Sequence, residues 1–216
     1  MDASAWNEGE LNKQVTEAYK CPFDFEQGPL LRVNLFTCSE QDYILLLVIH
    51  HIVCDGWSLW LLMDELRVLY QAEMVNRKVF LPYLNRQYTD YLQWQTEKLV
   101  SEEERLWGYW REQLAGELPV INLPTFRLRP PVLTYRGASY AFKLTKELTQ
   151  RLKELARTEE ATLYMILLAA FYVLLHRYSG QKDILVGSPT AGRDKTEFAG
   201  VVGYFVNPVV LRADIS

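Results

Sequence analysis

The sequence predicts an α/β (α+β) fold with two lobes, because strand-like and helix-like segments mix in both halves of the chain. An apolar run of strand length occurs at residues 43–49, and a shorter strand pattern, Asp-Ile-Leu-Val, occurs at residues 183–186. Long stretches with apolar residues at helical spacing occur in both halves, at residues 57–74 and 162–178. A proline-rich stretch at residues 115–136 has the composition of a linker between two lobes.

Composition and charge exclude several classes of protein. The chain has 216 residues, of which 49% are hydrophobic and 23% charged, a balance typical of a folded globular protein. The net charge is -4 and no basic stripe is present, which argues against a nucleic-acid partner. No apolar run reaches the about 18 residues that would span a membrane. The polar start is not a signal peptide, so we expect a cytoplasmic protein without a membrane partner.

The first half predicts a helix at residues 10–19, an antiparallel hairpin and three further helices. The hairpin pairs residues 30–36 with residues 43–49 through a polar turn. The helix that follows covers residues 57–74, and either Asp55 or Ser58 caps its start. Another helix begins at Tyr88, and Ser101–Glu104 read as a capping box at the start of the last.

The second half predicts a strand at residues 138–144, a helix at 145–157 and a buried helix at 162–178 that ends at Gly180. A strand at 183–186, a glycine-rich loop at 187–203 and a strand at 204–211 follow. We therefore divide the chain into a first lobe (1–114), a linker (115–136) and a second lobe (137–216). Nothing covers the last strand, so we expect the chain to be part of a larger domain.

The stretch from His50 to Ser58 carries the chemistry. It contains two of the three histidines, placed directly after a buried strand and four residues before an Asp-Gly pair. An imidazole at a strand end is well placed for acid–base catalysis at neutral pH. Cys54 lies beside it, but the three cysteines lack CxxC spacing, so we interpret them as free thiols and expect no metal site.

Five segments in order resemble the condensation domains of nonribosomal peptide synthetases. They are Phe23 to Arg32 (FDFEQGPLLR), the His-His-x-x-x-Asp-Gly motif of His50 to Gly56, Tyr88-x-Asp90-Tyr91-x-x-Trp94, Gly187 to Arg193 (GSPTAGR) and Val202 to Asn207 (VGYFVN). The resemblance implies two chloramphenicol-acetyltransferase-like lobes, each a mixed sheet with flanking helices and both incomplete, with a tunnel between them. It also implies that residues 1–114 are the rear of the N-terminal lobe and residues 137–216 the front of the C-terminal lobe.

The resemblance implies amide formation. An amine attacks a thioester, and donor and acceptor are each held by the 4'-phosphopantetheine arm of a carrier protein. No cofactor would then bind the domain directly, and the partners would be upstream and downstream peptidyl carrier proteins and the adenylation domain of the same synthetase. A hypothesis that follows is that the isolated 216 residues do not form the amide at a normal rate, while the parent protein does.

The resemblance also assigns the site. His51 carries the catalytic role, either as the base or as the group that positions the amine. His50 is expected to point back into the fold, since neighbours on a strand face opposite ways. Asp55, which we group with His51 and Gly56 as a catalytic residue, is either a second base or a buried structural anion. We prefer the anion, because a buried carboxylate needs a cation; Arg193 is our first choice of cation and Arg32 the second.

The remaining members of the site are backbone and wall residues. Gly56 permits a tight turn and leaves its N–H free near the substrate. Trp57 follows at the tunnel wall, and Ser58 either donates to the oxyanion or caps the helix. Gly203 and Asn207 are expected to line the tunnel.

Three alternatives stay open from the residues alone: an epimerisation domain, another acyltransferase with the same histidine motif, and a non-catalytic module that docks a carrier protein.

Overall fold

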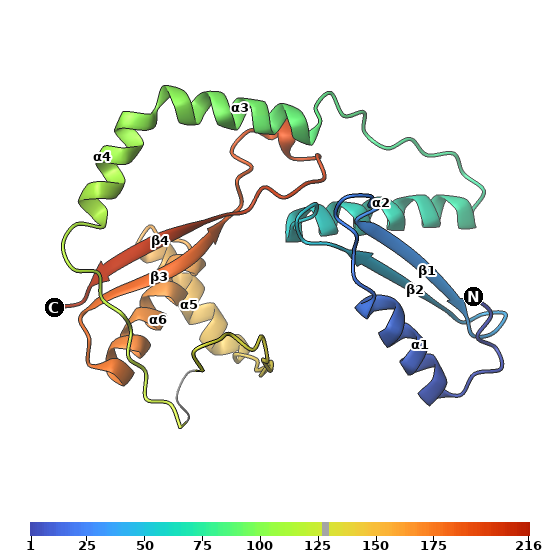
Figure 1. Ribbon diagram of the computed structural model, residues 1–216, viewed down its shortest axis with the longest axis horizontal. Coiled ribbons are helices and arrows are strands. Elements are labelled where there is room, and N and C mark those ends of the chain that lie inside the picture. Colours follow the sequence, from blue (N-terminus) through green and yellow to red (C-terminus); the bar gives the residue numbers. More distant parts are fainter. Residues whose placement is uncertain (127–129) are drawn as a thin grey trace. The chain divides into compact units, whose positions relative to one another are not determined.

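The computed structural model describes residues 1–126 and 130–216 and has an α+β architecture, which confirms the predicted fold class (Figure 1). The chain forms two compact units. The first unit comprises Met1–Glu102 and Pro189–Asn207, and the second comprises Glu103–Ser188 and Pro208–Ser216. A segment late in the chain therefore belongs to the same compact unit as the histidine motif.

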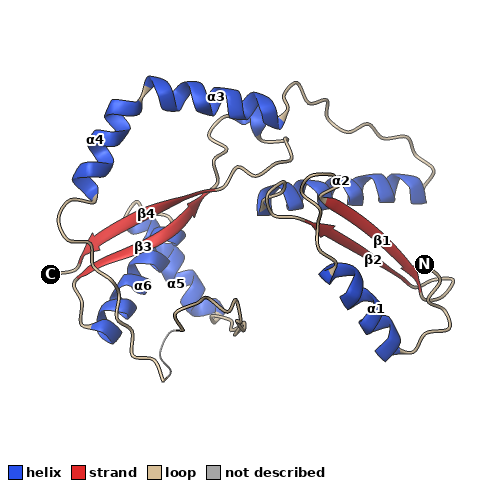
Figure 2. Ribbon diagram, in the orientation of Figure 1, coloured by secondary structure: helices blue, strands red, loops and turns tan. Residues whose placement is uncertain are grey.

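In the first unit, a two-stranded hairpin lies between two helices (Figure 2). Strand β1 (Leu31–Thr37) pairs antiparallel with β2 (Tyr43–Ile49), from the pair Leu31 and Ile49 to the pair Thr37 and Tyr43. The predicted hairpin is thus confirmed. Helix α1 (Glu8–Lys20) precedes it and α2 (Gly56–Met74) follows it. Helix α3 (Tyr88–Ser101) and the short 3-10 helix η1 (Thr196–Phe198) complete the unit.

An aromatic cluster joins α3 to the segment Pro189–Asn207. Its buried members are Tyr91, Phe198, Val201 and Phe205, and Tyr88 and Trp94 pack against them. Asp90 caps the start of α3, because its Oδ2 accepts the backbone N–H of Gln87 at 2.7 Å. The aromatic residues of the Tyr-x-Asp-Tyr-x-x-Trp motif therefore pack in this cluster, and its aspartate caps α3. The packing holds the segment Pro189–Asn207, which reaches the histidine motif, against α3.

The second unit contains α4 (Glu103–Gln113), α5 (Lys146–Thr158), α6 (Leu163–Ser179) and most of β3 (Asp183–Thr190) and β4 (Asn207–Asp214). Strands β3 and β4 form a two-stranded sheet, and the core gathers Tyr172, Leu175 and Ile184. Thr162 is the N-cap of α6, and its side chain accepts the N–H of Met165 at 3.2 Å. It ends at Gly180, which has a φ of 71° as predicted for a left-handed cap.

The expectation that the helix at 162–178 is buried is wrong. Only Tyr172 and Leu175 are buried in α6, while Met165 and Tyr178 are 57% and 63% exposed. The helix packs one face against a two-stranded sheet, which is too small to cover its other faces. The apolar composition of α6 therefore predicted more burial than the structure shows.

Two further expectations are wrong. Residues 138–144 form no strand and are exposed, because they pair with neither strand of the two-stranded sheet.

Ser101 starts no helix: it ends α3, where its Oγ donates to the carbonyl of Lys98 at 3.0 Å. A serine followed by glutamates resembles a helix start even where one helix ends and the next begins at once.

The last strand begins at Asn207 rather than at residue 204. The reason lies in the first unit, where the backbone N–H groups of Gly203 and Phe205 donate to side chains of α2 and its cap instead of to a neighbouring strand. An apolar, strand-like sequence is thus held in an irregular conformation by tertiary hydrogen bonds.

The described part of the linker 115–136 contains neither a helix nor a strand, and its residues 127–129 lie outside the described residues. The division into lobes at 1–114 and 137–216 stays a prediction. Among the described helices, none alone is long and apolar enough to cross a membrane; α5 and α6 pass such a test only together, across a bend of 104°.

Candidate active site

The histidine motif forms the connection between β2 and α2. The backbone N–H of His50 continues the hairpin by donating to the carbonyl of Leu30 at 3.0 Å. A turn follows, in which the N–H of Val53 donates to the carbonyl of His50 at 3.1 Å. The motif is therefore anchored at one end by the sheet, and Asp55 anchors its other end at the helix.

Asp55, not Ser58, is the N-cap of α2. Its backbone is extended, with φ -92° and ψ 178°, and its Oδ1 accepts the N–H of Ser58 at 2.7 Å. This cap makes Gly56 the first helical residue. Within the described part of the chain, the backbone N–H groups of Gly56 and Trp57 have no hydrogen-bond partner, as is usual for a first helical turn.

Arg193 forms the expected buried ion pair with Asp55. Its Nη2 lies 3.2 Å from Asp55 Oδ1, and the two side chains are only 4% and 1% exposed. The Nη1 atom donates to the carbonyls of Phe198 and Val201 at 2.8 and 2.7 Å. The guanidinium also lies over the ring of Phe205, 3.8 Å from its centroid. Arg193 therefore ties its own loop to the start of α2.

Arg32 does not take that place. Its guanidinium packs over the ring of Phe23, 4.0 Å from the centroid, and donates to the carbonyls of Cys21 and Pro22. Arg32 therefore holds the loop after α1 against β1.

Ser58 is fully buried and has no free hydrogen-bonding capacity. Its Oγ donates to the carbonyl of Gly203 at 2.8 Å and accepts from Arg193 Nη2 at 2.7 Å and from the N–H of Gly203 at 3.0 Å. A hydroxyl has one proton and two lone pairs, so all three are used. The suggestion that Ser58 donates to an oxyanion is wrong, and so is its suggested capping role.

The environment of Asp55 fixes its charge. Burial disfavours the carboxylate, but hydrogen bonds from Ser58 and Phe205 and the Arg193 guanidinium outweigh burial and lower the pKa of Asp55 below its usual 3.8. The Phe205 N–H donates to Oδ2 at 3.1 Å. Asp55 is therefore an anion at neutral pH with both of its oxygens occupied.

The lowered pKa of Asp55 predicts an acid-sensitive stability. A carboxyl whose pKa is lower when folded adds stability above its unfolded pKa of about 3.8, and this contribution is lost as pH falls through the folded pKa. We expect Asp55→Asn to lower the free energy of unfolding at pH 7, and this deficit to shrink as pH falls below 3.8. Urea unfolding of the wild type and of Asp55→Asn at a series of pH values measures this difference in the free energy of unfolding. A deficit that does not change with pH would contradict the assignment; Asp64→Asn, in an exposed pair with Arg67, is the control.

His51 is held through one ring nitrogen. Its Nδ1 lies 2.7 Å from the carbonyl oxygen of Cys54. Because a carbonyl only accepts, Nδ1 carries the proton in this contact, and the neutral ring keeps its lone pair on Nε2. The ring of Tyr204 meets the imidazole edge to face, with centroids 5.3 Å apart. Nothing in residues 1–126 and 130–216 bonds to Nε2, so this is the ring nitrogen that can accept a proton.

His50 has the opposite arrangement. Its Nδ1 accepts the N–H of Ile52 at 3.1 Å, so its neutral ring carries the proton on Nε2. Its ring lies between Phe23 and Phe25, with centroids 5.7 and 4.7 Å away. His50 is half-buried among these aromatic rings, in agreement with the expectation that it points into the fold.

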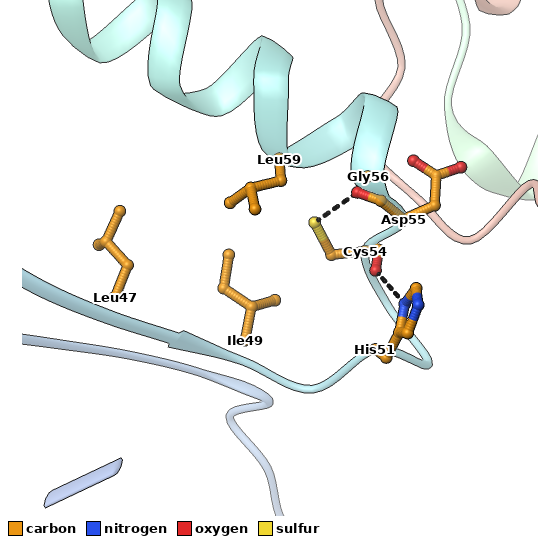
Figure 3. A pocket seen from close by; sticks show the side chains of 7 residues that line it. All are labelled: Leu47, Ile49, His51, Cys54, Asp55, Gly56 and Leu59. Atoms are coloured by element: carbon orange, nitrogen blue, oxygen red, sulfur yellow. Dashed lines mark hydrogen bonds between the residues drawn. The ribbon is translucent and has the colours of Figure 1, made fainter. Parts of the chain in front are cut away.

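A pocket of about 370 Å³ opens beside His51 (Figure 3). Aliphatic side chains of Leu47 and Ile49 from β2 and of Leu59 from α2 form one part of its lining. His51, Cys54, Asp55 and Gly56 form the other part. The pocket therefore borders both the imidazole and the first turn of α2.

The remaining predicted site residues are Trp57, Gly203 and Asn207. Trp57 is half exposed and its indole N–H donates to the carbonyl of Ala199 at 3.0 Å, so it joins α2 to the same loop as Arg193. Gly203 is buried and packs on the ring of Tyr88. Asn207 is exposed, and its carbonyl accepts from Thr190. The tunnel-lining role of Gly203 and Asn207 stays a prediction.

The turn attributed to Gly56 does not require glycine. Its φ is not in the left-handed region, and a Cβ placed there would meet nothing within 4 Å.

Cys54 is a buried free thiol whose pKa is raised by burial and by Asp55, which disfavours a thiolate. In the described ranges, no three His, Cys, Asp or Glu side chains are close enough to hold a metal ion.

Comparison with known proteins decides the family. The family model described as "Condensation domain" matches residues 1–216. The chain belongs to the condensation-domain family. A curated relative of this condensation-domain chain is a linear gramicidin synthase polypeptide of Brevibacillus parabrevis, 48% identical over 197 residues. That match covers 90% of the chain but only 4% of the synthase polypeptide.

Solved structures agree with the family. A four-domain nonribosomal peptide synthetase bound to AMP and glycine matches all of this chain and 16% of that protein, with 27% identity and a TM-score of 0.80. The epimerization domain from the third module of a tyrocidine synthetase matches with a TM-score of 0.85 and 20% identity, a likeness of fold alone. The match covers all of this chain and 50% of that domain.

Sequence reasoning missed three residues that build the condensation-domain site: Gly192, Tyr204 and Phe205. Each acts through its backbone or by ring contact, which leaves no pattern of chemical side chains. The only signal was their position, since Gly192 precedes Arg193 and the other two lie inside the Val202 to Asn207 segment.

Proposed function

We propose that this chain is part of a condensation domain that forms an amide between a carrier-bound acyl thioester and the amine of a carrier-bound aminoacyl thioester. The observation that carries the proposal is the geometry of His51. Its Nδ1 is fixed by the carbonyl of Cys54, so Nε2 is the acceptor of the neutral ring, it bonds to no residue that the structure describes, and the side chain lines a pocket. The family membership and the synthase relatives support the same reaction.

The reaction needs little more than a base, an oxyanion site and alignment of the two arms. The amine nitrogen attacks the thioester carbonyl, a C–N bond forms, and the amine proton passes to His51 Nε2. When the tetrahedral intermediate collapses, the C–S bond breaks and the leaving thiolate takes the proton. The N–H groups of Gly56 and Trp57 bond to no described residue and lie at the start of α2, where developing negative charge is favoured. We assign the oxyanion to them.

Asp55 takes no proton in this scheme. Both of its oxygens accept hydrogen bonds, and its lowered pKa makes it a weak base. It instead holds the helix start, and through Arg193 and Phe205 it holds the loop that faces His51. We therefore assign Asp55 and Arg193 as structural anchors and His51 as the catalytic residue.

The substrates and partners follow from the proposed reaction. Each substrate would arrive on the 4'-phosphopantetheine arm of a peptidyl carrier protein, upstream for the donor and downstream for the acceptor. An adenylation domain of the same synthetase would load the acceptor. Three free cysteines suit the reducing cytoplasm, where we place the protein.

The test is amide formation by a complete condensation domain, meaning this chain with flanking residues of its protein to the length of the solved domains. We expect His51→Ala to slow product formation by about 10²–10⁴-fold, the usual contribution of a positioned base. A single-turnover assay with both carrier proteins loaded, read by mass spectrometry of the product, measures the rate.

The same assay separates the alternatives. His176→Ala is the matched control, since that histidine contacts the carbonyl of Gln181 in the second unit and has no part in the scheme. Amide formation at the wild-type rate by His51→Ala would refute the catalytic assignment. A changed configuration of the bound aminoacyl group without amide would indicate epimerisation, and carrier binding without either product would indicate a docking module. We expect the isolated 216 residues to be slower than the complete domain.

A further inference from the structure

The ring of Tyr204 is the second contact of the His51 imidazole. We propose that Tyr204 is a positioning residue that fixes the plane of this imidazole and so presents Nε2 to the amine. The inference rests on the proposed function, because it assigns how the base of that reaction is held. The two rings meet at an interplanar angle of 83° with centroids 5.3 Å apart, a favourable edge-to-face geometry.

His51 needs such a contact because little else surrounds it. The residue is exposed, and the one side-chain hydrogen bond that it makes to a described residue, with the carbonyl of Cys54, fixes one atom of the ring. One fixed atom leaves the imidazole free to rotate about that contact, and a rotation that breaks the hydrogen bond also releases the ring to exchange tautomers. A second contact on the ring restricts that rotation, and small displacements of a reacting group cost rate steeply.

The backbone of Tyr204 is unusually well fixed for an irregular segment. On one side, the backbone N–H of Gly203 donates to Ser58 Oγ, and the Gly203 carbonyl accepts from that hydroxyl. On the other side, the backbone N–H of Phe205 donates to Asp55. The carbonyl of Tyr204 itself accepts the hydroxyl of Tyr88. Three consecutive residues are thus held by α2, its cap and α3, which places the Tyr204 ring relative to the His51 turn.

The ring, and not the hydroxyl, makes this contact. Within residues 1–126 and 130–216, the phenol oxygen of Tyr204 makes no hydrogen bond. In the same ranges, His51 is the one aromatic partner of the ring, whereas Tyr88, Tyr91 and Phe205 contact one another in the core cluster. Tyr204 is half-buried beside this cluster and is not one of its members.

The test compares Tyr204→Leu with Tyr204→Phe in the complete condensation domain. Long-range ¹H–¹⁵N spectra of ¹⁵N-histidine-labelled protein report the tautomer of His51, assigned by comparison with His51→Ala. We expect wild type and Tyr204→Phe to show His51 protonated on Nδ1, and Tyr204→Leu to show mixed tautomers. We expect the single-turnover rate to fall about tenfold or more in Tyr204→Leu, with the substrate concentration for half-maximal rate unchanged, and to be retained in Tyr204→Phe.

Two controls accompany these variants. The opposite tautomer of His50 serves as an internal standard for the fold of the turn. Tyr140→Leu, which removes an aromatic ring that is 89% exposed, should change neither the spectrum nor the rate.

The outcomes separate this inference from the proposed function. An unchanged His51 spectrum in Tyr204→Leu, or mixed tautomers with the wild-type rate, would overturn the positioning role. A wild-type rate in His51→Ala would overturn the proposed function instead, and the positioning role with it. Mixed tautomers with a slowed reaction, rescued by Tyr204→Phe, would support both.

Discussion

Gly192→Ala is expected to destabilise the first unit by about 2–5 kcal/mol. Gly192 has a φ of 64°, which costs a residue with a Cβ about 1–2 kcal/mol. A Cβ there would also lie 2.0 Å from the carbonyl oxygen of Phe205. Relieving that overlap requires a backbone shift, and such overpacking costs about 1–3 kcal/mol. Because Phe205 donates to Asp55, the shift would also disturb the site.

Urea unfolding of the complete domain measures this effect, and two other glycines provide a graded series. Gly180→Ala meets nothing within 4 Å but has a φ of 71°, so it should lose only about 1–2 kcal/mol. Gly56→Ala meets nothing and has an ordinary φ, so its stability should match that of the wild type. A Gly192→Ala protein as stable as Gly56→Ala would show that the loop is not packed on Phe205 as described.

Arg193→Met is expected to cost about 3–5 kcal/mol, the usual effect of breaking a buried ion pair. The change leaves the Asp55 carboxylate, 1% exposed, without its cation. It also removes the donor to the carbonyls of Phe198 and Val201. Since Arg193 helps to lower the pKa of Asp55, the variant should also lose less stability than the wild type as pH falls below 3.8.

The matched control is Arg67→Met. Arg67 pairs with Asp64 at 2.8 Å, but both side chains are more than half exposed, so the loss should be at most about 1 kcal/mol. Equal unfolding free energies for the two variants would mean that the Asp55–Arg193 pair does not anchor the loop.

Local sequence signals were sufficient for much of the fold and for part of the site. Alternating apolar residues and a polar turn predicted the β1–β2 hairpin, because its pairing is set within a few residues. The polar residues before the apolar helix narrowed its cap to Asp55 or Ser58, and the structure has the cap at Asp55. The need of a buried carboxylate for a cation singled out Arg193, 138 residues away.

The errors share a physical cause, which is tertiary contact. Ser58 has the position of a capping or donor hydroxyl, but Gly203 and Arg193 saturate it. Tyr204 and Phe205 have strand-like neighbours, but side chains of α2 and its cap bind the surrounding backbone. Many apolar side chains of α6 are exposed, because only a two-stranded sheet packs against one face of the helix. None of these contacts is encoded by residues close in sequence.

In the proposed reaction, His51 performs the chemistry while Asp55 only holds the site. The most direct measurement compares His51→Ala with Asp55→Asn in the complete condensation domain, with single-turnover amide formation and urea unfolding recorded on the same samples. We predict that His51→Ala loses the reaction and keeps its stability, whereas Asp55→Asn loses stability and keeps a rate proportional to its folded fraction. A stable Asp55→Asn protein without activity, beside an active His51→Ala protein, would contradict the account.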